Sequence, residues 1–316
     1  MTDALSLDSG RHEPAGIGSA SPGRRAGKGG RLRAPRWFLL PALIAYGFVM
    51  IYPSLAGAFY AFTDWRGRRT AQFIGLDNFV QLLGDHQARA SLANTLTLAV
   101  VVVTVQTLIG LSLALALSAK LRTRTLLRTL FFIPVVLPSI IVAVLWRYLY
   151  VPGGPIDTVL EWLGLGSLTQ SWLGDSSVAL GSVIATIIWQ NVGLTMVIYL
   201  AGIERIPVEL YEAASIDGAS AWSRLWNITL PLLAPATTIV ITLSMVGSLK
   251  LFDQVFVMTG GGPGYATETL SMVMYRQAFV LGNYGYGTAI ALVLTLIVAV
   301  AAYFQLRVSR RFEVEE

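Results

Sequence analysis

Six long apolar stretches constrain this chain more than any other feature. They lie near residues 37–62, 91–118, 129–151, 178–203, 229–257 and 285–306. A helix needs about 20 mostly apolar residues to cross a bilayer, and only helices or closed barrels satisfy every backbone hydrogen bond inside lipid. The stretches are too long and too continuous for barrel strands, which show a short alternation of apolar and polar residues. The sequence therefore predicts an all-α integral membrane protein with six transmembrane helices.

The composition agrees with this prediction and excludes several functions. Charged residues make up 13% of the chain, about half the share of roughly 25% in soluble domains. The net charge of +5 comes from basic residues beside the apolar stretches, so we expect no nucleic-acid partner. The chain has no cysteine, and its two histidines, His12 and His86, are far apart. Thiol chemistry is therefore excluded, and we expect no metal site.

The basic residues also predict an orientation. Residues 1–35 are rich in Gly, Ser, Pro and Arg, which predicts a disordered basic tail before a six-span domain at residues 36–316. A signal peptide is the alternative for this start, but the apolar run from Trp37 to Phe62 is too long for one. Most Lys and Arg residues lie in this tail, after the second and fourth stretches, and at the C-terminus. Cytoplasmic loops carry this excess, so both termini are predicted to be cytoplasmic.

A polar loop at residues 204–228 joins the fourth and fifth stretches. Pro207 suits the first position of a helix, and Glu209 and Glu212 would complement the positive end of its dipole. Asp217-Gly218 would end that helix, and the segment ASAWSRLWNI predicts a second one. The small residues of this helix–turn–helix would let another protein approach closely. The alternative is a connector that packs on its own bundle.

This loop resembles a known family signature. Glu212-Ala213-Ala214, Gly218 and Ile228-x-Leu230-Pro231 match the EAA motif of ABC-importer permease subunits. The surrounding sequence resembles the sugar-uptake branch, which includes the maltose and glycerol-3-phosphate permeases. The segment FDQVFVMTGGGP, at residues 252–263, is similar to the loop after the fifth span in that branch.

The resemblance implies a fold, partners and a set of contact residues. It implies the type I importer permease fold in a bacterial plasma membrane, a second related permease, an ATPase pair that binds ATP and Mg²⁺, and an external solute-binding protein. In that family the loop is the coupling helix, which sits in a groove of the ATPase. By resemblance, the contact residues are Glu212, Ala213, Ala214, Asp217 and Gly218.

The chain carries no ATPase motif of its own. A P-loop needs a lysine between Gly and Ser or Thr, and none of the three lysines, Lys28, Lys120 and Lys250, has those neighbours. An intramembrane enzyme would need a nucleophile and a base, or metal ligands, within the spans. The cysteine-free stretches contain no histidine either. We therefore expect neither a catalytic site nor a resident cofactor, and ATP hydrolysis in a separate subunit.

Polar residues inside the stretches predict the solute pathway, because such residues are costly in lipid and usually functional. We expect solute contact at Asn191, Ser248, Lys250 and Asp253. Lys250 and Asp253 are three apart and could pair on one helix, in which case they are either part of the pathway or a structural pair near the external boundary. The aromatic residues Trp146, Tyr148 and Trp189 are candidates for contact with a sugar ring, or else they belong to the interfacial belt.

A self-sufficient secondary transporter of a small polar solute is the main alternative. Six spans without a detectable inverted repeat argue against it, and such a transporter needs no EAA loop. The sequence leaves the identity of the solute open between neutral sugars, polyols and glycerol phosphate.

Overall fold

The computed structural model describes residues 36–68, 70–119 and 122–309. The predicted disordered tail at 1–35 lies outside these residues, so that prediction stays open. The chain divides into two units, Met1–Val49 and Met50–Glu316. The described residues form helices, with one isolated antiparallel bridge between Thr63 and Phe73, so the all-α prediction holds for them.

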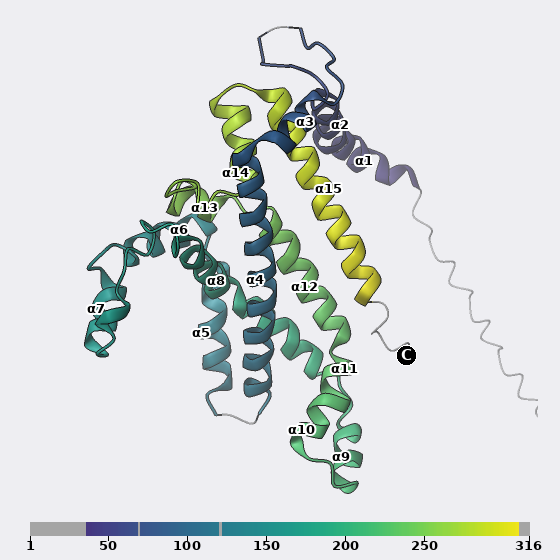
Figure 1. Ribbon diagram of the computed structural model, residues 1–316. Coiled ribbons are helices and arrows are strands. Elements are labelled where there is room, and N and C mark those ends of the chain that lie inside the picture. Colours follow the sequence, from purple (N-terminus) through teal and green to yellow (C-terminus); the bar gives the residue numbers. More distant parts are fainter. Residues whose placement is uncertain (1–35, 69, 120–121, 310–316) are drawn as a thin grey trace, which may run out of the picture. The chain divides into compact units, whose positions relative to one another are not determined.

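The first unit contains η1 (Arg36–Leu39), α1 (Leu40–Tyr46) and the start of the π-helical η2 (Gly47–Ile51). The second unit, drawn as a ribbon in Figure 1, continues with α2 (Tyr52–Tyr60), α3 (Asp77–Gly84), α4 (His86–Ser118), α5 (Arg124–Val136), α6 (Ser139–Leu149), α7 (Pro155–Trp162), η3 (Gly166–Leu168), α8 (Ala179–Ile203), α9 (Val208–Ile216), α10 (Ala221–Arg224), η4 (Leu225–Thr229), α11 (Leu230–Leu232), α12 (Ala234–Leu249), α13 (Asp253–Met258), α14 (Leu270–Tyr275), η5 (Arg276–Val280) and α15 (Tyr284–Ser309).

Two of the predicted spans are not single helices. Among the described residues, four helical segments, Leu40–Tyr60, α4, α8 and α15, are long and apolar enough to cross a membrane unaided. The third stretch is broken between α5 and α6, which meet at 101°. Pro138 causes this break, because its ring forces Leu137 into an extended conformation (ψ 136°). The prediction of six candidate spans therefore requires each bent pair to be one span.

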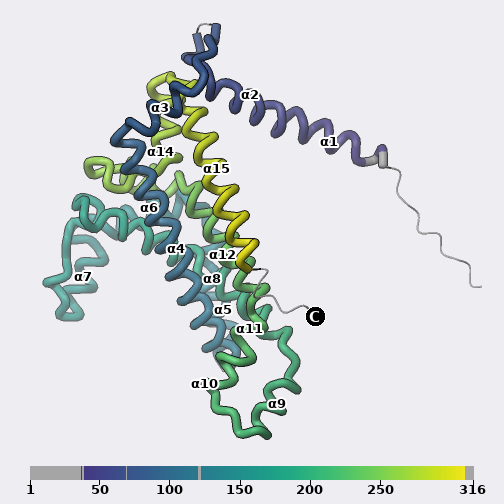
Figure 2. The backbone as a smooth tube through the Cα atoms, turned by 45° about the vertical axis from the view of Figure 1, so that its right-hand side comes forward, coloured from purple at the N-terminus to yellow at the C-terminus, as the bar shows by residue number. Residues whose placement is uncertain are grey.

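The fifth stretch, predicted as one segment near 229–257, is also interrupted. Its helices, α10–α11 and α12, meet at 64°, and α12 ends at Leu249. Residues 250–252 are not helical, and the short α13 then begins at Asp253. The loop at residues 204–228 and the break at 250–252 therefore lie toward opposite ends of α12. Figure 2 shows α9 and α10 of this loop together at one extremity of the second unit.

Helix α8 forms the centre of the second unit, and glycines bring α4 and α5 close to it. A Cβ atom on Gly193 would lie 2.0 Å from the backbone oxygen of Phe131 in α5. A Cβ atom on Gly110 of α4 would lie 2.3 Å from Cγ2 of Thr195 in α8. Small residues permit this backbone approach, which drives helix association in lipid. Helices α4, α5 and α8 therefore form a tightly packed frame.

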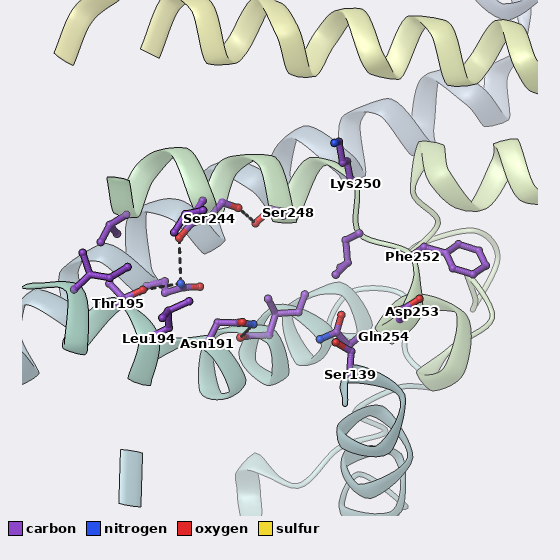
Figure 3. A pocket seen from close by; sticks show the side chains of 17 residues that line it. Ser139, Asn191, Leu194, Thr195, Ser244, Ser248, Lys250, Phe252, Asp253 and Gln254 are labelled. Atoms are coloured by element: carbon purple, nitrogen blue, oxygen red, sulfur yellow. Dashed lines mark hydrogen bonds between the residues drawn. The ribbon is translucent and has the colours of Figure 1, made fainter. Parts of the chain in front are cut away.

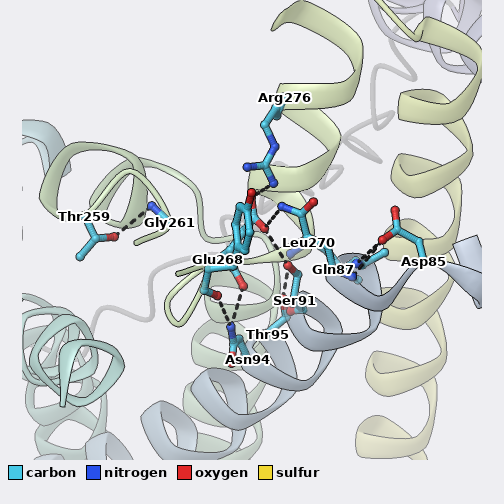
Figure 4. Close-up of polar contacts among 12 residues, drawn as sticks. Asp85, Gln87, Ser91, Asn94, Thr95, Thr259, Gly261, Glu268, Leu270 and Arg276 are labelled. Atoms are coloured by element: carbon cyan, nitrogen blue, oxygen red, sulfur yellow. Dashed lines mark hydrogen bonds and ion pairs between the residues drawn. The ribbon is translucent and has the colours of Figure 1, made fainter. Parts of the chain in front are cut away.

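At one end of this frame, a buried carboxylate fastens the loop at residues 259–269 to α4 (Figure 4). The side chain of Glu268 is fully buried, and it forms an ion pair with Arg276. It also accepts hydrogen bonds from Gln87 Nε2 at 2.7 Å and Ser91 Oγ at 3.2 Å. Asn94 Nδ2 donates to the backbone oxygen of Glu268 at 3.1 Å. These contacts fix the loop to the first turns of α4.

The pH dependence of stability should report on Glu268. Burial raises the pKa of this carboxyl above its ordinary value, although the hydrogen bond from Gln87 and the charge of Arg276 lower it. Folding therefore favours the protonated form. This contribution is complete below the ordinary pKa of 4.5 and is lost as the pH rises through the raised value.

We expect Glu268→Gln, which is neutral at every pH, to flatten that part of the stability profile. The measurement is the melting temperature of the purified protein in detergent as the pH is raised from about 4 to 8. Glu161→Gln, at an exposed position on α7, is the matched control and should keep the wild-type profile. Superimposable profiles for Glu268→Gln and the wild type would contradict the assignment.

Candidate functional site

The loop between α8 and α12 forms the predicted pair of helices. Gly218 adopts the left-handed conformation, with φ of +75°. Behind it the N–H of Ala219 donates to the oxygen of Ala214 at 2.8 Å, and the N–H of Gly218 donates to that of Ser215 at 3.2 Å. This pair of bonds is the Schellman motif, which favours glycine at this position. The prediction that Asp217-Gly218 ends the first helix is confirmed.

The start of this helix differs slightly from the prediction. Pro207 is the N-cap, and Val208 is the first helical residue. The predicted second helix begins at Ala221 and continues through the π-helical η4 into α11, so it extends to Leu232. Tyr211 Oη lies 3.0 Å from Thr229 Oγ1 and braces the two arms of the loop against each other.

The tip of this helix pair is exposed in the described part of the chain. Glu212, Ala213, Asp217 and Gly218 are exposed, and Ala214 is half-buried. Ile216 beside them is 87% exposed, although a large apolar side chain gains free energy from burial. The alternative of a connector packed on its own bundle therefore does not fit the tip. Sequence reasoning missed Ile216, since only its exposure separates it from the other apolar residues nearby.

A cavity of about 320 Å³, lined by both polar and apolar side chains, lies at the other end of α12 (Figure 3). Its walls come from α4, α8, α12, the break at 250–252, and the first residues of α6 and α13. All four residues predicted for solute contact line this one cavity, namely Asn191, Ser248, Lys250 and Asp253. Their side chains come from two helices, the break and the start of a third helix, so the fold brings them together from separate elements.

Hydrogen bonds order the cavity wall. Gln106 Nε2 of α4 donates to Thr195 Oγ1 at 2.8 Å and to Ser244 Oγ at 3.1 Å, so it joins α4, α8 and α12. Ser248 Oγ donates to the backbone oxygen of Ser244 at 2.6 Å. The sequence prediction missed Gln106, although an amide in the middle of an apolar span was the signal that could have found it.

Two possibilities raised by the sequence are not found at this cavity. Lys250 and Asp253 form no ion pair, because α12 ends before Lys250 and Asp253 begins another helix. Among the described residues, the ion pairs are Arg124–Glu204 and Arg276–Glu268. The aromatic candidates lie outside the cavity, so the alternative of the interfacial belt stays open for them. Trp146 and Trp189 pack against each other at 5.3 Å between ring centroids, and neither they nor Tyr148 line the cavity.

The arrangement suits recognition by hydrogen bonding. Hydroxyl and amide groups alternate with apolar side chains such as Ile187 and Leu243, and Lys250 and Asp253 contribute one charge of each sign. Within the part of the chain that the structure describes, no group of three His, Cys, Asp or Glu side chains could hold a metal ion. A small polar solute with several hydroxyl groups fits these donors and acceptors.

Comparison with known proteins identifies the family of this chain. Residues 106–314 match the family model described as "Binding-protein-dependent transport system inner membrane component". A probable ABC transporter permease protein of Pyrococcus horikoshii is 40% identical over 265 residues, covering 83% of this chain and 91% of that protein. The multiple sugar-binding transport system permease protein MsmF of Streptococcus mutans is 34% identical over 278 residues, covering 88% and 95%.

A solved structure has a similar fold. A chain in the crystal structure of the bacterial alginate ABC transporter, in complex with an alginate pentasaccharide-bound periplasmic protein, superimposes with a TM-score of 0.77 and 26% identity. The match covers 87% of this chain and 93% of that one. The all-helical fold, the apolar spans and these likenesses agree that this multi-pass membrane protein is a transport component. The chain belongs to the family of inner membrane components of binding-protein-dependent transport systems.

Proposed function

We propose that this chain is a permease subunit of an ATP-driven ABC importer that moves a sugar or sugar-like solute inward across a bacterial plasma membrane. The exposed helix pair at residues 208–224 is the observation that carries the proposal. A transporter that works alone gains nothing from exposing Ile216 and a small-residue surface, whereas a separate ATPase subunit would cover them. Relatives such as the multiple sugar permease MsmF and the alginate transporter support a carbohydrate solute.

The proposed topology has six spans, with each bent helix pair counted as one. Both termini and the coupling loop at 204–228 are cytoplasmic, and residues 36–316 form one permease domain. An ion pair supports this arrangement, because Arg124 at the start of α5 contacts Glu204 at the end of α8 at 2.5 Å. The two basic loops that follow the second and fourth spans therefore lie at the same end of the bundle, as the excess of positive charge on one side requires.

The helix pair is the proposed contact with the ATPase. Glu212, Ala213, Ala214, Asp217 and Gly218 form its surface, and Glu212 pairs with a basic group of the ATPase. ATP and Mg²⁺ bind to that subunit and not to this chain. The other proposed partners are a second related permease, which completes the pathway, and an extracytoplasmic solute-binding protein like the periplasmic protein in the alginate transporter complex.

ATP dependence is the direct test of the proposed function. Proteoliposomes that contain the complete complex and its binding protein should accumulate the solute when ATP is supplied on the cytoplasmic side, without any ion gradient. Uptake that needs an ion gradient and ignores ATP would instead support a self-sufficient secondary transporter.

The cavity is the proposed half of the solute pathway. Asn191 Nδ2 donates to the backbone oxygen of Ile187 at 2.9 Å, which leaves Asn191 Oδ1 to accept from a solute hydroxyl. We expect Asn191→Leu to raise the KM for uptake by about 2- to 10-fold, the effect of one lost hydrogen bond. Uptake is measured with the sugar that stimulates ATP hydrolysis by the complex. Ser112→Ala removes an exposed hydroxyl outside the cavity and should leave the KM unchanged. Equal KM values for the two variants would remove Asn191 from the pathway.

A further inference from the structure

Two buried amide side chains form a relay of hydrogen bonds. The relay joins α8 to the break between α5 and α6 and to α13, which follows the break at 250–252. Gln254 Nε2, in the first turn of α13, donates to Gln190 Oε1 in α8 at 2.8 Å. Gln190 Nε2 donates in turn to the backbone oxygen of Leu137 at 2.9 Å. Gln190 and Gln254 are only 4% and 3% exposed. Neither the solute prediction nor the coupling loop uses this relay.

The relay ends at the point where the third span bends. Leu137 lies between α5 and α6, which meet at 101°. In a continuous helix its carbonyl oxygen would accept from the N–H of Ile141, but the extended residues Leu137 and Pro138 prevent this. An unpaired carbonyl inside a membrane protein costs free energy. Gln190 therefore supplies the hydrogen bond that the bend takes away.

The two ends of the relay differ in how firmly they are held. Gln190 lies one turn before Gly193, where α8 and the backbone of α5 are in direct contact. In contrast, α6 follows α5 of this frame through the non-helical Leu137-Pro138, and α13 follows α12 through the non-helical residues 250–252. Helices α6 and α13 pack against each other, and their residues Ala143 and Val255 belong to one apolar cluster that also includes residues of α4 and α8. Helices α6 and α13 therefore form a packed pair, and each of them is connected to the helix before it by non-helical residues.

Both members of this pair contribute to the cavity. Ser139, the first residue of α6, lines it, and so do Asp253 and Gln254 of α13 (Figure 3). A change in the angle at either break would therefore move one wall of the cavity relative to Asn191 on α8. The amide relay is one side-chain hydrogen-bond path between this wall and the frame. Tyr150 Oη, just after α6, forms a second by donating to the backbone oxygen of Ser182 in α8 at 3.2 Å.

We propose that Gln190 is a positioning residue that sets the angle between α5 and α6 and, through Gln254, the place of the α6–α13 wall. The importance of that wall for transport rests on the proposed function, whereas the angle is a property of the chain itself. A distance measurement across the bend tests the proposal without any solute, so its failure would not be a failure of the proposed function.

The chain is suited to this measurement because it has no cysteine. Leu126 of α5 and Tyr148 of α6 are 68% and 69% exposed, and both are replaced by cysteine and spin-labelled in the assembled complex. We expect one narrow distance distribution with wild-type Gln190. Gln190→Met keeps the length of the side chain but removes both hydrogen bonds, and it should at least double the width of the distribution.

Two further variants make the result specific. Gln254→Met breaks only the first bond of the relay, so it should broaden the distribution less than Gln190→Met, and the double variant should match Gln190→Met alone. Gln305→Met is the matched control, because Gln305 accepts from Thr242 at 2.9 Å and joins α12 to α15 away from the bend. It should leave the distribution narrow.

Three outcomes would overturn the proposal. The first is an unchanged distribution in Gln190→Met, and the second is equal broadening by Gln305→Met. The third is a double variant whose broadening equals the sum of the broadening by Gln190→Met and by Gln254→Met. Melting temperatures measured on the same samples show whether each variant is folded, so a general loss of structure is distinguished from a released bend.

Discussion

Gly218→Trp is expected to weaken the binding of the ATPase by at least about 30-fold, which corresponds to about 2 kcal/mol. Two effects contribute. A residue other than glycine is strained at φ of +75°, and an indole at the turn holds the ATPase away from the surface formed by Glu212, Ala213 and Ala214. Apart from its two chain neighbours, no described atom lies within 4 Å of a Cβ placed on Gly218, so the new side chain starts in open space.

The chain offers a closely matched control for this experiment. Gly164 ends α7 with φ of +74°, and a Cβ atom placed on it would also have no described atom within 4 Å. The same pair of bonds follows it, from Leu165 N–H to Leu160 at 2.8 Å and from Gly164 N–H to Glu161 at 2.9 Å. Gly164→Trp therefore carries the same backbone strain at a site outside the coupling loop.

The measurement is co-purification of the ATPase with the tagged subunit in a mild detergent. Wild type and Gly164→Trp should retain the ATPase, and Gly218→Trp should lose it while the subunit itself remains folded. If both tryptophan variants retain the ATPase equally, the helix pair is not the contact surface.

Gly193→Ala is expected to destabilise the subunit by about 3 kcal/mol or to prevent its accumulation. The new methyl group would lie 2.0 Å from the backbone oxygen of Phe131, and a backbone atom cannot turn aside as a flexible side chain does. Helix α5 must therefore move away from α8, and overpacking of this kind costs typically about 1–3 kcal/mol and occasionally more. The loss of contact would extend to Gln190, one turn away on α8.

Gly181 provides the opposite case on the same helix. A Cβ atom placed on it would have no described atom within 4 Å, so Gly181→Ala meets no obstacle. The gain in helix propensity of about 0.5–1 kcal/mol should leave it at least as stable as the wild type. The melting temperature of each variant is measured in detergent, with size-exclusion chromatography used to detect the folded protein that remains after heating. Equal melting temperatures for Gly193→Ala and the wild type would show that α5 moves away from Gly193 without a loss of stability.

The sequence predicted the elements whose cause is local. Apolar length located the spans, and the glycine at 218 located the turn, because both effects operate within a few residues. The bend at Leu137 was also foreseeable in principle, since Pro138 carries the signal, but the continuous apolar pattern concealed it. The end of α12 at Leu249 was not foreseeable from the apolar pattern, which continues through residues 251–258.

The cavity was predicted only in part, for a related reason. Polar residues in apolar stretches are conspicuous one at a time, so Asn191, Ser248, Lys250 and Asp253 were identified. Contacts between helices depend on packing, and the sequence does not display them. The hydrogen bonds of Gln106 with Thr195 and Ser244 depend on the close approach of α4 to α8 at Gly110. The Lys250–Asp253 pair assumed a continuous helix, whereas α12 ends at Leu249.

The length of α4 has a mechanical consequence. Its 33 residues extend about 50 Å at 1.5 Å per residue, whereas the hydrocarbon core of a bilayer is about 30 Å thick. One unbroken helix therefore carries two sets of contacts. Its first turns hold Glu268 through Gln87 and Ser91, and further along Gln106 contacts Thr195 and Ser244. A displacement of the loop at 259–269 would therefore reach the cavity wall along α4, without passing through the breaks at Leu137-Pro138 or 250–252.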